Sequence, residues 1–216
     1  MLPYTFQELL TPLERTPQAR KLASLSRQVK IEQFLLAEIM FNGNEHFRGL
    51  DFYLEENWRD LTVRKRQSDS PTGPLVDWVE AKMCYTDDLA RCLTGHAGAN
   101  EYRDHLHKDT QKQTRGFQTL PAGDRDTLLT SLLFAIQHDK SAPRQKYFPG
   151  FKNRCHHAAS AIEEAACKHI HKVIAPFIER EVVEEFSVQL DGACRLHVFA
   201  FRAAKDATGA GKQANK

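Results

Sequence analysis

The sequence predicts an α/β (α+β) protein whose central mixed β-sheet is flanked by helices. Apolar residues recur every three to four positions in the longer segments, and shorter apolar runs bounded by turn residues lie between them. With 216 residues, 41% of them hydrophobic, the chain is long enough for one domain with a substantial core. We expect residues 1–204 to form a single domain and the small, polar residues 205–216 to form a disordered tail.

Charge and cysteine content constrain partners and compartment only broadly. The formal net charge is +2, so an anionic partner would be recognised by a local patch. Cys84, Cys92, Cys155, Cys167 and Cys194 are odd in number and lie in apolar segments, as expected of reduced core cysteines. The N-terminal segment lacks a basic stretch followed by an apolar one, and no window is apolar for the length of a membrane span. We therefore expect a cytoplasmic protein with no membrane partner.

The first long element is a helix that begins at Thr16-Pro17. Thr is a favourable N-cap residue, and Pro fits the first helical position. An apolar stripe continues to the stop signal Asn42-Gly43-Asn44, which gives a helix of about 25 residues. Glu32 falls on this stripe, so an acid lies where a core residue is expected.

Strand candidates follow at about residues 46–55, 60–66 and 75–85, the last two separated by the turn-rich segment SDSPTGP. Thr86-Asp87-Asp88 caps a second helix, which breaks at the Gly-rich segment TGHAGAN. A polar helix then covers residues 101–117. The apolar run TLLTSLLFAIQHD predicts a strand, although its length leaves a short helix open.

The C-terminal third predicts a helix and a hairpin. The helix covers about residues 155–179, with Pro176 bending it or ending it early. Asp191-Gly192, flanked by two apolar runs, predicts the hairpin.

A basic loop precedes that helix. Between residues 138 and 157 there are five basic residues and one acid, Asp139, so the local charge is +4. Interleaved aromatic residues make the segment suitable for phosphate contacts and base stacking, although a solvated loop whose aromatic residues fill the core is an equal alternative. The candidate nucleic-acid-binding residues are Lys140, Arg144, Lys146, Tyr147, Lys152 and Arg154.

The stretch LVDWVEAKMCYTDD, residues 75–88, carries two charges in an apolar strand. Side chains alternate along a strand, so Glu80 and Lys82 share one face, whereas Asp77 points to the other unless a bulge intervenes. Buried charges are costly unless they pair, reach the sheet edge or hold a metal ion. A surface pair at the end of the strand is the simpler alternative.

Further acids accompany this pair. Asp51 lies in the apolar segment GLDFYL, and Glu32 lies on the inner stripe of the first helix. Carboxylates held close together repel one another unless a cation neutralises them, and Mg²⁺ prefers such oxygen ligands. The constellation therefore predicts a metal site. Glu32 paired with a neighbouring base at the surface is an equally good alternative for that residue.

These residues resemble the PD-(D/E)xK, or restriction-endonuclease-like, nuclease superfamily. Its pattern is an acid on a first helix, an Asp on a core strand and (D/E)-x-K on the next strand of a hairpin. The matching positions are Glu32, Asp51, Glu80 and Lys82, with Asp60 as the alternative to Asp51. Asp51 is preferred because a metal ligand is best held by a rigid, buried strand. The resemblance covers about residues 17–138 and leaves residues 139–204 as a C-terminal elaboration.

The resemblance implies phosphodiester hydrolysis that depends on Mg²⁺ or Mn²⁺. Asp51 and Glu80 would bind the metal, Lys82 would position the attacking water and stabilise the charge on the phosphate, and Glu32 would be an outer or second-metal acid. The implied substrate is nucleic acid, with DNA favoured, and a homodimer is compatible with cutting both strands. The alternative is a non-catalytic interaction or nucleic-acid-binding protein on a nuclease-like or other α/β fold.

Overall fold

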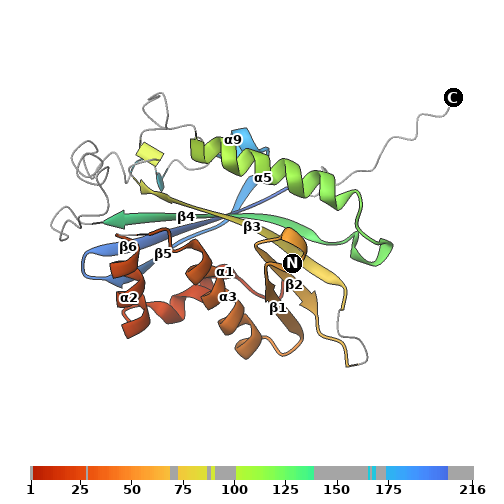
Figure 1. The fold of residues 1–216 in the computed structure, drawn as a ribbon, viewed down its shortest axis with the longest axis horizontal. Helices are drawn as coiled ribbons and strands as arrows, with labels where there is room; N and C mark the ends of the chain where they lie inside the picture. The colour runs from red at the N-terminus through yellow and green to blue at the C-terminus, as the bar shows by residue number, and fades with distance from the viewer. Residues whose placement is uncertain are drawn as a thin grey trace.

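A computed structural model describes residues 2–27, 29–68, 73–86, 89–90, 101–138, 165, 167–168 and 174–203 (Figure 1). Within these ranges six strands form one sheet in the order β1-β2-β3-β4-β6-β5. Neighbouring strands are antiparallel except β3 and β4, which are parallel, so the predicted mixed sheet is confirmed. The strands are β1 (Leu50–Leu54), β2 (Leu61–Lys65), β3 (Leu75–Tyr85), β4 (Leu128–His138), β5 (Glu181–Asp191) and β6 (Cys194–Arg202).

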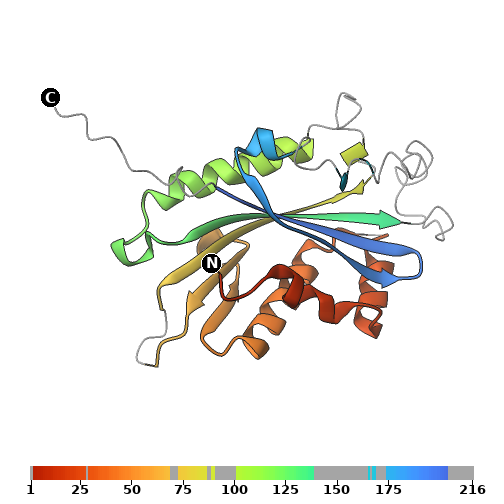
Figure 2. The same ribbon diagram turned by 180° about the vertical axis from the view of Figure 1, so that it is seen from behind.

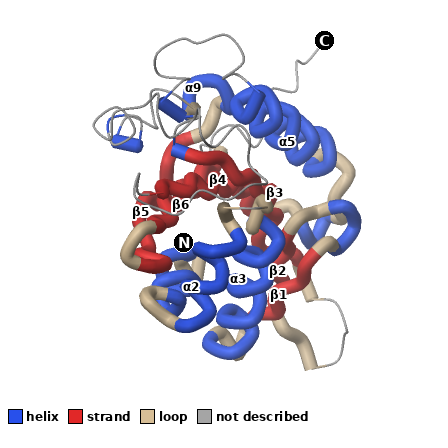
Figure 3. Tube along the Cα trace, turned by 60° about the vertical axis from the view of Figure 1, so that its left-hand side comes forward, coloured by secondary structure: helices blue, strands red, loops and turns tan. Residues whose placement is uncertain are grey.

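Helices cover both faces of this sheet, as Figures 1 and 3 show. One face packs against α1 (Phe6–Leu10), α2 (Pro17–Leu25) and α3 (Glu32–His46), and the other against α5 (Glu101–Phe117) and α9 (Ala175–Ile178). Alternate residues of β3 serve the two layers. Val79, Ala81 and Met83 belong to the core with α1 to α3, whereas Trp78 and Cys84 belong to the cores on the opposite face. The three 3₁₀ turns in the described ranges are η1 (Thr11–Leu13), η2 (Glu56–Trp58) and η3 (Ala122–Asp124).

The long first helix predicted from the sequence is two helices. Its start is confirmed, because the Thr16 side chain accepts a hydrogen bond from the Ala19 backbone at 3.0 Å. The helix ends at Leu25, and the chain restarts at Ile31, whose backbone N–H lies 3.1 Å from the sulfur of Met83 on β3. This tertiary contact fixes the start of α3 and makes Glu32 its first residue.

The predicted stop at Asn42-Gly43-Asn44 is wrong, because α3 continues to His46. Gly43 instead allows close packing, since a Cβ atom there would lie 2.6 Å from the ring of Phe52 on β1. The Asn44 side chain accepts a hydrogen bond from the Phe52 N–H at 2.8 Å and donates one to the Phe52 carbonyl at 3.0 Å. Two residues that often end helices therefore dock α3 against the sheet edge.

Gly43→Ala is expected to lower the free energy of unfolding by about 1–3 kcal/mol, because the added methyl group overpacks the contact with Phe52. The sign of the change in stability is diagnostic, because replacing Gly by Ala in a helix interior otherwise raises the free energy of unfolding by about 1 kcal/mol. Urea denaturation of both proteins measures the difference. Gly49→Ala is the control, because a Cβ atom there meets nothing within 4 Å. Stabilisation by Gly43→Ala would contradict the packing described here.

Other predicted elements are confirmed, most of them with the predicted limits. β3 has its predicted limits, β4 matches the predicted strand, α5 matches the predicted polar helix, and the turn after Asp191 joins the long β5 and β6 hairpin (Figure 2). The first strand candidate is shortened to Leu50–Leu54, because α3 continues to His46 and a turn then leads into the strand. Pro176 lies in the first turn of the short α9 and so begins a helix there.

Several predictions lie on residues outside the described ranges. These include residues 87–88 and 91–100 of the second helix, most of the predicted helix before Pro176, the tail, and the basic loop with Lys140, Arg144, Lys146, Tyr147, Lys152 and Arg154. Of the cysteines, Cys84, Cys167 and Cys194 are buried. None of the helices in the described ranges combines the length and apolarity that a membrane crossing requires.

Candidate functional site

The candidate site lies where β3 extends past the start of β2. The two strands pair from Arg64 and Leu75 to Leu61 and Val79, so β3 beyond Val79 continues without β2 beside it. A carboxylate oxygen of Asp60, the residue before β2, accepts a hydrogen bond from the Ala81 N–H at 2.7 Å. The Met83 backbone donates another to Glu32 at the start of α3. Two acids from different elements thus bind successive N–H groups on this edge of β3.

Glu80 and Lys82 point toward α5, as strand alternation predicts. Glu80 is only 2% exposed, and its Oε1 accepts a hydrogen bond from the Trp78 indole at 2.7 Å. Lys112 on α5 donates to both Glu80 oxygens, at 2.9 and 3.0 Å. The Lys82 ammonium lies 2.8 Å from a carboxylate oxygen of Asp109, one helical turn before Lys112. Glu80 and Lys82 are therefore each neutralised by a residue of α5 and not by each other.

The pKa values show that these groups act on one another. Burial raises the pKa of Glu80, hydrogen bonds from Lys112 and Trp78 oppose the shift, and the charge of Asp60 adds to it. Burial likewise raises the pKa of Glu32. The charge of Lys82 opposes this shift, and the charge of Asp60 adds to it.

The pKa of Lys82 is raised despite burial, because Asp109, Glu32 and Asp60 favour its charged form. The charge of Asp60 thus adds a smaller contribution to the pKa shift at each of Glu32, Glu80 and Lys82.

Asp51, the core acid preferred from the sequence, lies elsewhere. It sits on the edge strand β1, where Arg66 binds its carboxylate at 2.6 Å. In register, Asp51 aligns with Arg64 and through it with Leu75. At about 3.3 Å per residue and about 4.8 Å per strand, Glu80 is about 16 Å along the sheet and about 10 Å across it. The structure brings Asp60, and not Asp51, to Glu80 and Lys82.

Sequence reasoning missed the residues of α5 that complete the cluster. Asp109, Lys112, Gln113 and Gly116 recur at three-residue and four-residue spacing, which indicates one helix face. The Gln113 amide donates to the Trp78 carbonyl at 2.8 Å, and a Cβ atom at Gly116 would lie 2.3 Å from the Trp78 ring. A polar helix face by itself indicates exposure to solvent. The glycine at helical spacing on this face was the sequence signal that the helix packs closely against the sheet.

The turn that precedes Asp60 has an unusual backbone. Glu55, Asn57 and Trp58 have φ values of 52°, 54° and 66°, in the left-handed region. Lys112, which binds Glu80, also donates to the Trp58 carbonyl. This segment lines a cavity of about 580 Å³ formed by Glu55, Asn57, Trp58, Arg59 and Asp60.

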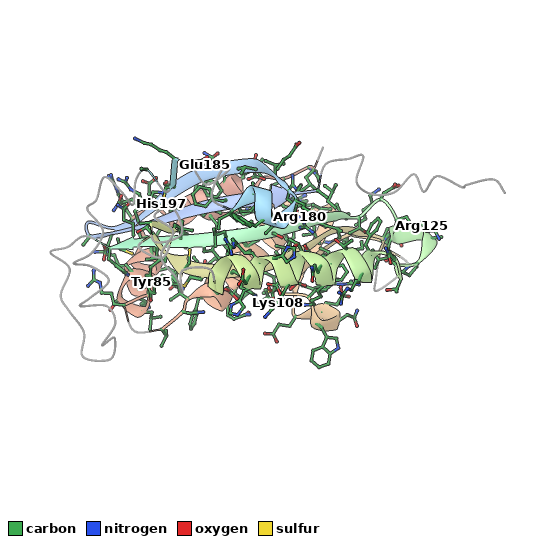
Figure 4. All side chains as sticks on the ribbon, turned by 90° about the horizontal axis from the view of Figure 1, so that it is seen from above. Tyr85, Lys108, Arg125, Arg180, Glu185 and His197 are labelled. Carbon is green, nitrogen blue, oxygen red and sulfur yellow. The ribbon has the colours of Figure 1, made fainter. Side chains whose placement is uncertain are left out.

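A second cavity of about 720 Å³ lies on a different flank of α5. Its lining includes Arg115, Arg125 and Arg180. Arg180 is buried and donates to the Leu129 carbonyl at 3.1 Å and to Ser131 at 2.9 Å, and burial lowers its pKa to about 10. Figure 4 shows Arg180 and Lys108 on opposite sides of α5. Arg180 nevertheless lies near the cluster around Glu80, because Ser131 aligns with Glu80 across β3 and β4 and the charges of Asp77 and Glu80 oppose the lowering of the Arg180 pKa.

No three or more His, Cys, Asp and Glu side chains in the described part of the chain are arranged as ligands of one metal ion. Both oxygens of Glu80 are bound by Lys112, so ligation by Glu80 requires Lys112 to withdraw. Burial is the main cause that raises the pKa of both Glu32 and Glu80, and like-charge repulsion from Asp60 adds to it; a cation bound between these carboxylates would relieve that repulsion. Comparisons of the chain with models of protein families, with curated proteins and with solved structures give no match.

Proposed function

We propose that the protein is a metal-dependent nuclease that hydrolyses phosphodiester bonds of nucleic acid, with DNA favoured, on a restriction-endonuclease-like core. The observation that carries the proposal is the convergence of Asp60, Glu80, Lys82 and Glu32 at the free edge of β3. The chain order α3, β1 to β3, α5, β4 agrees with the helix, strands, helix, strand order of that superfamily. Asp60 replaces Asp51 as the core acid, because only Asp60 reaches the E-x-K pair.

Each residue then has a role. Asp60 and Glu80 would hold Mg²⁺ or Mn²⁺, which would supply polarisation of the phosphoryl oxygen and a coordinated water of lowered pKa. Lys82 positions that water and stabilises the charge that develops on the phosphate. Glu32 acts from outside the metal shell, where its bond to the Met83 backbone holds it. Lys112 binds both oxygens of Glu80 and would have to withdraw for this carboxylate to hold the ion.

The test is cleavage of supercoiled, linear duplex and single-stranded DNA and of RNA by the purified protein. We expect cleavage with Mg²⁺ or Mn²⁺, none after chelation with EDTA, and none by the Lys82→Ala variant. Activity that survives in Lys82→Ala would show that the assigned site does not perform the reaction. Circular dichroism of the variant controls for folding.

One observation favours the alternative of a non-catalytic nucleic-acid-binding or interaction protein. Glu80 is neutralised by Lys112 and Lys82 by Asp109, so the charges are satisfied within the protein. The two candidates differ in metal affinity. Calorimetric titration with Mn²⁺ should give a binding isotherm that Glu80→Gln abolishes if the nuclease proposal is right, and no heat of binding in either protein if the ion pairs are purely structural.

A further inference from the structure

Trp58 is the most exposed of the large hydrophobic residues in the described part of the chain, at 90%. Trp is highly buried on average, so an indole that is almost entirely exposed indicates a contact surface. The other tryptophan, Trp78, is 4% exposed and packs beneath α5. The two tryptophans therefore have different roles.

The turn that carries Trp58 is held in a defined conformation by hydrogen bonds. A bulky residue at φ 66° is a conformational outlier, and such outliers cluster at ligand-binding positions. Glu56, in the same turn, accepts hydrogen bonds from Arg64 at 3.0 Å and from Thr62 at 2.7 Å, and the Glu55 N–H donates to the Asp60 carbonyl at 3.2 Å. The contacts of Glu56 tie the turn to β2, and the bond between Glu55 and Asp60 joins its two ends.

The turn is also tied to the candidate site. Lys112 donates both to the Trp58 carbonyl and to the Glu80 carboxylate, so one ammonium group joins the indole-bearing residue to a proposed metal ligand. Asp60 follows Trp58 by two residues. The cavity beside them, about 580 Å³, is within the size range of small-molecule sites. Among the residues that line it, the Arg59 guanidinium, 4.4 Å from the centre of the Trp78 ring, is the basic group, beside the carboxylates of Glu55 and Asp60.

We propose that Trp58 stacks on an unpaired base of the nucleic acid next to the phosphate that is cleaved. The preferred substrate would then be single-stranded or would carry unpaired nucleotides, because a base within an uninterrupted duplex has no free face for the indole. The inference rests on the proposed function for the identity of the ligand. The alternative occupant, an apolar protein surface, is less suited to one isolated indole beside several charged groups.

The test measures binding in the absence of cleavage, with Ca²⁺ in place of Mg²⁺. A fluorescein-labelled single-stranded oligonucleotide is titrated with wild type, Trp58→Ala, Trp58→Phe and Phe41→Ala and followed by anisotropy. We expect Trp58→Ala to weaken binding by about 5- to 100-fold, with most of the affinity restored by Trp58→Phe. Binding of a blunt duplex of equal length should change by less than about twofold in both Trp58 variants. Phe41 is the control, because it is 63% exposed on α3 and distant in sequence from the turn.

Intrinsic fluorescence is a second measurement. The chain has two tryptophans, so quenching by an unlabelled single strand that disappears in Trp58→Phe belongs to Trp58. Wild-type affinity of Trp58→Ala for single strands, or equal losses on single strand and duplex, would overturn the inference, as would failure of the wild type to bind any oligonucleotide. Trp58-dependent binding of single strands without cleavage in Mg²⁺ would uphold base stacking by Trp58 while refuting the nuclease. Normal binding and cleavage of single strands by Trp58→Ala would uphold the nuclease while overturning the stacking.

Discussion

Asp60→Asn is expected to slow metal-dependent cleavage by about 10³-fold or more, whereas Asp51→Asn is expected to leave the rate within about twofold. Asp60 raises the pKa of Glu80 and Glu32 by its charge, and it is the acid whose loss would remove a metal ligand from this cluster. An asparagine oxygen can still accept the hydrogen bond from Ala81, so the local fold should persist while the charge is lost.

Asp51→Asn is the matched control, because it removes the same charge from a neighbouring strand. It weakens one partly exposed ion pair with Arg66, which is worth at most about 1 kcal/mol. Initial rates at several Mg²⁺ concentrations, with urea denaturation of both variants, separate loss of metal affinity from loss of stability. Normal activity in Asp60→Asn together with inactivity in Asp51→Asn would move the core acid to β1 and contradict the assignment.

Local patterns in the sequence were sufficient for much of the fold. β3, β4 and the hairpin after Asp191 are specified by apolar runs and turn residues whose information lies within a few positions. The break between α2 and α3 is different. It depends on contact between Ile31 and Met83, which are 52 residues apart in the chain, and so leaves no local pattern.

The same division applies to the candidate site. Alternation alone placed Glu80 and Lys82 on one face, because that property belongs to a single strand. The sequence favours Asp51 over Asp60 because Asp51 lies in an apolar strand, yet Asp60 reaches the site because β3 extends beyond the start of β2, which is a relation between two strands. Lys112 comes from a helix that follows β3, and its pairing with Glu80 becomes visible only once that helix is packed on the sheet. Site residues whose position depends on a single strand could be predicted from the sequence. Those whose position depends on how two elements pack together could not.

Acid is expected to destabilise the protein through His197 by up to about 3 kcal/mol between pH 7 and pH 4. Burial, and then the charge of Arg195, lower the pKa of His197 from 6.5 to about 4. Its two ring nitrogens lie 2.9 Å from Ser187 Oγ and 2.9 Å from Gln137 Oε1. In the unfolded chain the His197 imidazole is protonated below pH 6.5, whereas in the folded protein it is protonated only near pH 4. The contribution of His197 is therefore complete above pH 6.5 and is lost as the pH falls through 4.

Asp77 should make the free energy of unfolding change with pH in the opposite direction, and this contrast distinguishes the two groups. Burial is the main cause that raises the pKa of this carboxyl from 3.8 to about 6, although Tyr4 and Thr130 donate hydrogen bonds to it at 2.8 Å. The folded state holds the proton more tightly, so this contribution is complete below pH 3.8 and is lost, by about 3 kcal/mol, as the pH rises through 6.

Urea denaturation at pH 4, 5.5 and 7 measures both effects by comparing wild type with His197→Gln and with Asp77→Asn. Relative to wild type, His197→Gln should gain stability toward pH 4, and Asp77→Asn should gain stability toward pH 7. His138, whose pKa burial also lowers to about 4, acts in all three proteins, and its contribution therefore cancels in the differences. Parallel pH profiles for the three proteins would mean that neither group is buried as the structure places it, which would also question the packing of β3 and β6 around the candidate site.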